Sequence, residues 1–297
     1  MAQDPKKVAP RTLFLAERVK AEKKYKQLLS VIMRKLQRII AGVTNYGQMP
    51  AALARYAATK EFQRLCEQAA SQTATMLAVG QMRSWRAAAM ASARGRRLFL
   101  ALRKELKTKR IGGQIRQIVD ANSQLIKTVP HNLAERFSRM AAETQYAGKR
   151  PDELLEIFKK MAPHLTDVEA RRIARTESAK AATALVEARA NAFGLGLYIW
   201  DTVDDQRVRD SHRNMEGVIC AWNDPPNPEA LAGEENVYGS YHPAGIFNCR
   251  CVPLPVVDLL DIKFPARVHN HGTIVTVRNL NELRGLFGQI IARYEAA

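Results

Sequence analysis

Residues 191–200 read NAFGLGLYIW, and this stretch separates two kinds of sequence. Before it, apolar residues recur at spacings of three and four, the pattern of amphipathic helices. Gly194 and Gly196 are suited to end the last of these helices, and Leu197–Trp200 has the composition of a strand. Short strand candidates and a final helix at 281–295 follow. The pattern predicts an α+β protein with a basic, mostly helical N-terminal half, then a compact α+β domain with a small sheet, and a C-terminal helix.

Capping residues and glycines indicate where the helices begin and end. Helical patterns are expected at 12–40, 51–68, 71–110, 114–128 and 131–145. Gly112–Gly113 is expected to break the pattern. Thr166 with Glu169 has the spacing of a capping box that opens the next helix, and Asn279 with Glu282 has the same signature for the last one.

The net charge of +17 comes from 46 Lys and Arg against 29 Asp and Glu, and it is uneven along the chain. Residues 1–150 hold 30 basic and 9 acidic side chains, whereas residues 151–250 hold 11 basic and 16 acidic ones. Such asymmetry is typical of domains with different partners. We therefore expect a basic helical region at 1–150, a compact domain at 151–258, and a strand and helix at 259–297.

Composition excludes several classes of protein. Apolar residues make up 46% of the chain and charged residues 25%, which is the composition of a globular protein and excludes wholesale disorder. Four cysteines in 297 residues argue against a disulfide framework and favour a reducing compartment. We find no uninterrupted apolar run of about 18 residues and no secretory signal, so no membrane association is expected.

The basic helices predict contact with nucleic-acid phosphates or with an acidic protein. Only Trp85 lies among the basic residues as an aromatic platform, so base stacking is not expected and any DNA contact should be independent of sequence. A charge that only keeps the protein soluble is the third interpretation. The candidate phosphate-binding residues are Lys23, Lys24, Lys26, Arg34, Lys35, Arg38, Arg94, Arg96, Arg97, Lys107, Lys109 and Arg110.

A second group of candidate residues lies between 204 and 251. Cys249 and Cys251 are separated by one residue, so in an extended segment both thiols point to the same side. Together with His212 and His242 they could hold one structural zinc ion as a Cys2His2 tetrahedron. Two alternatives stay open, namely buried apolar thiols and a disulfide or redox pair.

The sequence shows no convincing arrangement of a nucleophile and a base, so we do not expect an enzyme. The alternative is a metal-dependent nuclease or an effector enzyme acting on DNA. Such an enzyme would need a metal ion with an open coordination position.

One ordered set of motifs covers about residues 165–258. The motifs are Ala174–Arg175–Thr176–Glu177, Trp200, Asp205–Gln206–Arg207–Val208–Arg209, His212, Gly217, His242–Pro243 and Asn248–Cys249–Arg250–Cys251. This set resembles the phage head morphogenesis family named after the phage Mu F protein, whose members are minor head proteins of tailed phages. His242–Pro243 is set back from the cysteines by the short insertion 244–247.

The resemblance implies a structural protein present at low copy inside the capsid of a bacteriophage. It implies incorporation in the host cytoplasm during head assembly and a portal-associated position in the virion. Its partners would be the phage portal protein, packaged double-stranded DNA and the major capsid or scaffolding protein. The region 1–150 would face the portal or the DNA. Beyond the metal candidates, the family motif carries over to Arg175, Glu177, Asp205 and Arg207.

Overall fold

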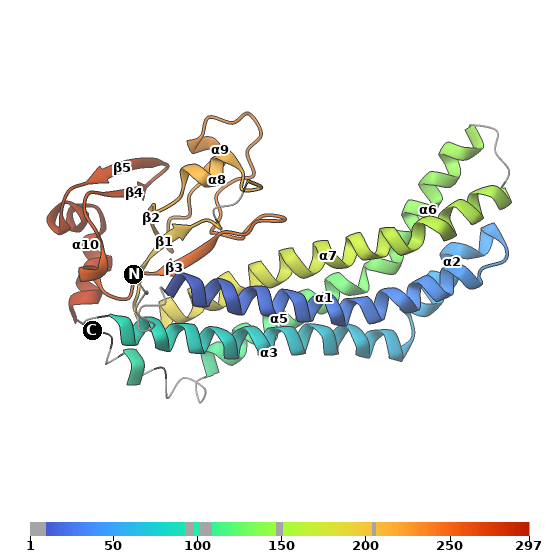
Figure 1. Ribbon diagram of the computed structural model, residues 1–297, viewed down its shortest axis with the longest axis horizontal. Helices are drawn as coiled ribbons and strands as arrows, with labels where there is room; N and C mark the ends of the chain where they lie inside the picture. The colour runs from blue at the N-terminus through green and yellow to red at the C-terminus, as the bar shows by residue number, and fades with distance from the viewer. Residues whose placement is uncertain are drawn as a thin grey trace, which may run out of the picture. The chain divides into compact units, whose positions relative to one another are not determined.

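The structure, a computed structural model, describes residues 10–92, 95, 98–100, 102, 109–146, 151–203 and 206–296 (Figure 1). Its N-terminal half is helical, as the sequence predicts. The helices are α1 (Pro10–Gly42), the 3-10 turn η2 (Tyr46–Gln48), α2 (Met49–Ala57), α3 (Lys60–Ala91), α5 (Lys109–Lys127), α6 (Val129–Tyr146) and α7 (Pro151–Ala192).

Two expectations about helix boundaries are wrong. The pattern at 51–68 is divided between α2 and α3, because Thr59 begins a new helix by accepting the Phe62 N–H on its hydroxyl at 3.2 Å. Gly112–Gly113 lies inside α5. A glycine costs a helix only about 1 kcal/mol relative to alanine, which the packing of the rest of α5 exceeds.

Thr166 does not cap a helix, which is a third correction. It lies in the middle of the 42-residue helix α7, which begins at Pro151 and continues past Pro163. Its hydroxyl donates to the carbonyl of Ala162 at 2.8 Å, an interaction within the helix, and accepts from Gln37 at 2.6 Å. Because the side chain is buried and fully used in these contacts, the capping-box spacing has no local effect.

The contacts group the chain into two compact units. We call residues 21–75 and 116–177 the helical unit, and residues 1–20, 76–115 and 178–297 the sheet unit. The domains expected from the sequence are continuous segments that end at residues 150 and 258. The two units seen here are each assembled from separate segments of the chain. The helical unit has one apolar core, in which Leu29, Leu36, Phe62 and Phe158 are completely buried.

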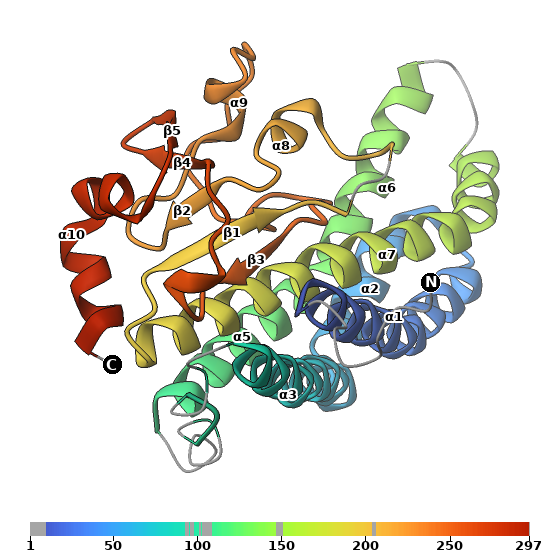
Figure 2. The same ribbon diagram turned by 60° about the vertical axis from the view of Figure 1, so that its left-hand side comes forward.

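The sheet unit contains a five-stranded mixed sheet in the order β3-β1-β2-β4-β5 (Figure 2). Only β2 and β4 pair in parallel. The strands are β1 (Leu197–Asp201), β2 (Ile219–Ala221), β3 (Val252–Pro255), β4 (Ala266–Asn270) and β5 (Thr273–Val277). The connections contain the short elements α8 (Asp210–Asn214), α9 (Pro228–Leu231) and η4 (Leu259–Asp261).

Alternation along β1 assigns the two faces of this sheet to two cores. Leu197 and Ile199 pack with the C-terminal helix α10 (Leu280–Ala296), whose Leu283 is completely buried. Tyr198 and Trp200 point to the opposite face. That second face packs on helix residues such as Trp85 and Val186 and also contains Cys249 and Cys251. The strand β1 therefore has the core around α10 on one face and the candidate site on the other.

The capping box of the last helix is confirmed. The Asn279 side chain accepts the Glu282 N–H at 3.0 Å, and the Glu282 carboxylate accepts the Arg278 N–H at 2.8 Å. Among the described helices, none combines the length and the apolar composition that a membrane crossing requires.

Candidate metal centre

Three of the four predicted metal ligands come together in the sheet unit. His212 lies on α8, while Cys249 and Cys251 lie on the segment that leads into β3. All three side chains are buried, with relative exposures of 2%, 2% and 1%. Their ligand atoms lie within 4.8 Å of one another, and they form the one such group found among the residues that the structure describes.

A single nitrogen of His212 faces both sulfurs. Its Nδ1 lies 3.5 Å from Cys249 Sγ and 3.4 Å from Cys251 Sγ. In a tetrahedral zinc site, with Zn–S of about 2.3 Å and Zn–N of about 2.0–2.1 Å, nitrogen and sulfur ligands stand ~3.6 Å apart. The observed spacing therefore suits a zinc-sized ion with little rearrangement. The donor set of one imidazole and two thiolates is one that zinc prefers.

His242, the fourth predicted ligand, does not join this group. Its Nδ1 lies 3.1 Å from the Tyr198 hydroxyl, and its ring packs against Trp222 with centroids 5.1 Å apart. The turn that follows it contributes a backbone group instead. The N–H of Ala244 donates to Cys249 Sγ at 3.3 Å. The complete Cys2His2 set expected from the sequence is therefore not assembled among the described residues.

The turn after His242 has the geometry needed for this backbone contact. The Gly245 N–H donates to the His242 carbonyl at 2.9 Å, with Pro243 and Ala244 as the central residues. Ala244 has a φ of +69°, as the third position of a type II turn requires. Thr183 on α7 donates its hydroxyl to the Pro243 carbonyl at 2.7 Å and so fixes the turn. An alanine in the left-handed region is an unusual choice that here aims an N–H at a sulfur.

The pKa values of the two cysteine thiols are shifted in opposite directions. The thiol of Cys251 donates toward the sulfur of Cys249, and this contact holds the pKa of Cys249 well below its usual range. The same contact, together with burial, raises the pKa of Cys251. Zinc binding requires two thiolates, so the lowered pKa of Cys249 favours loss of its proton and the raised pKa of Cys251 opposes loss of the second one. None of the four cysteines is in a disulfide.

Three residues that contact this site carry no recognisable sequence signal. Arg18, on α1 and 232 residues away in sequence, donates to the carbonyls of Arg250 and Cys251 at 2.7 and 2.9 Å. Tyr241 and Glu229 contact the far side of His212. Tyr241 is next to His242, but nothing in its spacing distinguishes it, and Glu229 lies in a proline-rich loop. Only the folded chain shows these contacts.

The other motif residues that the structure describes are divided between the two units. Arg175 and Glu177 lie on α7 in the helical unit, where Arg175 Nε is 3.5 Å from Glu22 Oε1. Arg207 is exposed in the sheet unit, and Asp205 lies outside the described residues. The carry-over of these four residues from the family motif stays a prediction.

The predicted phosphate-binding residues are only partly described. On α1, Lys26 is 3.4 Å from Asp167 and Lys35 is paired with Glu61, whereas Lys23, Arg34 and Arg38 are exposed. Lys24 is half-buried on the same helix. Arg94, Arg96, Arg97 and Lys107 lie outside the described residues, and so do the side chains of Lys109 and Arg110 at the start of α5.

The positive charge is shared by both units. The helical unit holds 20 basic and 12 acidic residues, and the sheet unit holds 26 and 17. The division into a basic half and an acidic stretch describes the sequence, but the two folded units have similar net charges. The reason is that the sheet unit includes basic residues from 1–20 and 76–115.

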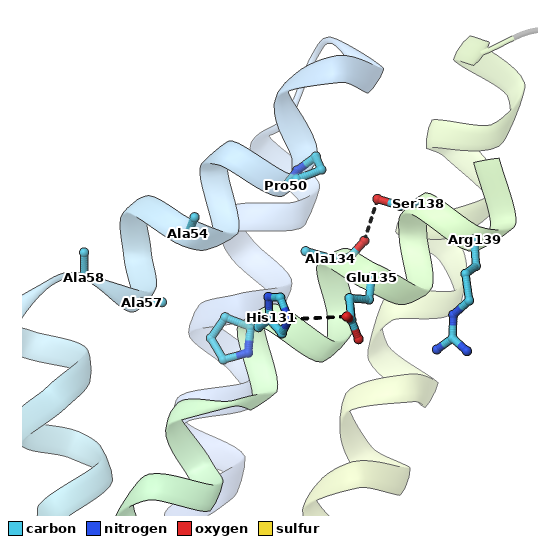
Figure 3. Close-up of a pocket in the computed structure, with 10 residues that line it drawn as sticks. Pro50, Ala54, Ala57, Ala58, His131, Ala134, Glu135, Ser138 and Arg139 are labelled. Atoms are coloured by element: carbon cyan, nitrogen blue, oxygen red, sulfur yellow. Dashed lines mark hydrogen bonds and ion pairs between the residues drawn. The ribbon is translucent and has the colours of Figure 1, made fainter. Parts of the chain in front are cut away.

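A pocket of ≈ 930 Å³ lies apart from these residues, in the helical unit between α2 and α6 (Figure 3). Its wall is mostly alanine and proline. His131 Nε2 lies 3.3 Å from Glu135 Oε1 at this pocket, and both side chains are exposed. None of the predicted site residues lines this pocket.

Comparison with known proteins agrees with the resemblance seen in the sequence. The family model described as "Phage Mu protein F like protein" matches residues 138–254, a segment that contains all three residues of the metal centre. This match supports, for that part of the chain, the family resemblance predicted from the motif.

One curated relative was also found. It is a protein of Haemophilus influenzae that is described only as uncharacterized, and it is 30% identical over 145 residues. The alignment covers 49% of this chain and 30% of the relative, so this chain matches less than a third of that protein. No solved structure was found to match.

Removing either cysteine of the centre should abolish tight zinc binding. We expect the full chain to bind one zinc ion, and Cys249→Ser or Cys251→Ser to weaken binding more than ~100-fold, since loss of outer-shell partners alone costs about 10–100-fold. Metal content after dialysis against a weak chelator measures this. Cys220→Ser, which removes another buried thiol of the sheet unit, is the matched control and should keep the zinc. Equal zinc content in all four proteins would show that the centre does not bind it.

His242 should make the metal-free chain less stable in weak acid. Burial lowers the pKa of His242 to about 4, whereas a histidine in the unfolded chain titrates near ~6.5. The unfolded state therefore binds the proton first as the pH falls, and stability is lost between about pH 6.5 and pH 4, by up to ~3 kcal/mol. Urea unfolding at pH 7 and pH 5 should show a smaller difference for His242→Gln than for the original chain. His164→Gln, at an exposed site, serves as the control, and an unchanged pH dependence in His242→Gln would refute the assignment.

Proposed function

We propose that this chain is a structural minor head protein of a tailed phage, incorporated at low copy inside the capsid near the portal. It would assist head assembly and DNA packaging or ejection. The observation that carries the proposal is the family match over residues 138–254. The buried centre of His212, Cys249 and Cys251 lies within the matched segment, so the site and the family assignment concern the same part of the chain.

Sequence-independent contact with packaged DNA is the second part of the proposal. Its support is the net charge of +17 and the exposure of Lys23, Arg34 and Arg38 on α1. Ammonium and guanidinium groups bind phosphates of any sequence, and each neutralised phosphate releases counterions. A protein that meets DNA of every sequence during packaging needs this kind of contact and no base readout.

The proposed partners follow from the same role. They are the phage portal protein, the packaged double-stranded DNA and the major capsid or scaffolding protein. The chain would enter the head in the host cytoplasm during assembly and stay in the interior of the virion. A structural zinc ion would stabilise the loop-rich part of the sheet unit, where residues 206–218 and 222–251 contain little regular structure beyond α8 and α9.

Quantitative mass spectrometry of phage particles tests the role. We expect a few copies per portal ring in purified mature virions and a similar number in empty procapsids, because a protein built in at assembly is present before DNA enters. The portal protein in the same sample provides the copy-number standard. Absence from both particles would contradict the proposal.

The salt dependence of DNA binding tests the phosphate contact. Lys23→Glu, Arg34→Glu and Arg38→Glu combined should lower the slope of log K against log salt by roughly 2–3, because each lost phosphate contact removes about 0.9 from the slope. Binding of a random-sequence duplex to the full chain, measured between 50 and 200 mM salt, gives the slope.

A control with the same change in net charge separates local contact from overall attraction. Arg278→Glu, Arg284→Glu and Arg293→Glu combined alter α10 and the residue before its N-cap, which are outside the predicted contact set. We expect this variant to keep the slope. Equal losses in the two variants would contradict a contact made by α1.

A further inference from the structure

The side of His212 that faces away from the cysteines is held by a chain of two buried side chains. Its Nε2 lies 2.9 Å from the Tyr241 hydroxyl, and that hydroxyl lies 2.5 Å from Glu229 Oε1. Glu229 Oε1 is also 3.7 Å from His212 Nε2. The Glu229 side chain has no exposed surface, and Tyr241 is 9% exposed.

The chemistry of the three groups fixes the direction of these hydrogen bonds. A carboxylate can only accept, so the Tyr241 hydroxyl donates its proton to Glu229. The hydroxyl oxygen is then left to accept, and the proton that it accepts comes from His212 Nε2. Nε2 therefore carries a hydrogen, and Nδ1 is the nitrogen available as a ligand. Nδ1 is also the atom that lies 3.4 and 3.5 Å from the two sulfurs.

The fold builds this arrangement from two loop elements. Glu229 lies on the one-turn helix α9, which Asn227 caps by accepting the Ala230 N–H at 3.2 Å. Tyr241 is placed by its own N–H, which donates to the Pro226 carbonyl at 2.9 Å. In the sheet unit α9 contacts α8, the helix that carries His212 (Figure 1). The segment 226–229 therefore positions both Glu229 and Tyr241.

Burial of the Glu229 carboxylate lowers the stability of the fold unless the carboxylate has a specific role. Its second oxygen, Oε2, has no hydrogen-bond partner among the described residues. Burying a charged group with incomplete hydrogen bonding is unfavourable, and an apolar side chain of similar size would avoid that cost. Orientation of a metal-binding histidine by a carboxylate is a recognised reason to keep such a group, because it fixes the tautomer and increases the basicity of the ligand.

We propose that Glu229 and Tyr241 are positioning residues of the metal centre, which hold a proton on His212 Nε2 and direct Nδ1 to a zinc ion shared with Cys249 and Cys251. This inference does not depend on the role in phage heads. It requires only that the three ligands bind a metal ion.

Two substitutions and one matched control test the chain of contacts. Glu229→Gln keeps the size but can donate as well as accept, and Tyr241→Phe removes the hydroxyl. Each should weaken zinc affinity about 10–100-fold in competition with a chromogenic chelator. Glu235→Gln, an exposed residue of the same loop, should leave the affinity unchanged. The folded state of each metal-free variant is checked by near-ultraviolet circular dichroism.

A spectroscopic readout distinguishes positioning from general support. In the full chain labelled with [15N]histidine, the His212 ring is assigned by its loss in His212→Asn. We expect a proton on Nε2 before and after zinc is added, and a zinc-dependent shift of Nδ1 alone. In Glu229→Gln the Nε2 proton should be partly lost.

The outcomes are decisive even if a variant fails to fold. An unprotonated Nε2 in the original chain, or zinc bound through Nε2, would overturn the proposal without any variant. Unchanged zinc affinity in folded Glu229→Gln and Tyr241→Phe would overturn it as well, and so would the absence of zinc binding by the original chain. A 10–100-fold loss with the Nε2 proton observed would support it.

Discussion

The contact of one imidazole nitrogen with two sulfurs is the constraint on which the sheet unit depends. His212 Nδ1 draws together the short helix α8 and the segment of Cys249 and Cys251, which are 37 and 39 residues further along the chain. Between them runs a loop with one helical turn and no long strand. Ordering such a loop costs conformational entropy, and a metal ion bound only in the folded state would offset part of that cost. Arg18 extends the same constraint to α1 by holding the carbonyls of the cysteine segment.

The part of the site that sequence could predict is the part with a spacing rule. Cys249 and Cys251 follow the period of an extended chain, and His212 belongs to a motif with a fixed order, so all three were identifiable. His242 looked equivalent to His212 by residue type, but the turn after it directs a backbone N–H to the sulfur and leaves the ring beside Tyr198. Glu229 could not be predicted at all, because its role arises from a loop whose path only tertiary contacts determine.

The fold, like the site, has parts that the sequence could predict and parts that it could not. Periodicity predicted the helical half and the strand Leu197–Trp200, since burial on one face of a helix or on alternate faces of a strand leaves a repeating pattern. Local signals that compete with packing were misleading. The capping box at Thr166 is overridden within α7, where that hydroxyl bonds back to the preceding turn, and Gly112–Gly113 is accommodated within α5. The boundaries between the two units fall inside α1, α3, α5 and α7. Sequence patterns could not predict this grouping, because it depends on which distant segments pack together.

The candidate metal centre of His212, Cys249 and Cys251 lies inside the segment that matches the family. The most direct measurement is X-ray absorption at the zinc edge of the zinc-loaded full chain. The predicted spectrum has two sulfur ligands at about 2.3 Å and imidazole nitrogen at about 2.0–2.1 Å. A first shell of oxygen and nitrogen without sulfur would contradict the centre formed by His212, Cys249 and Cys251.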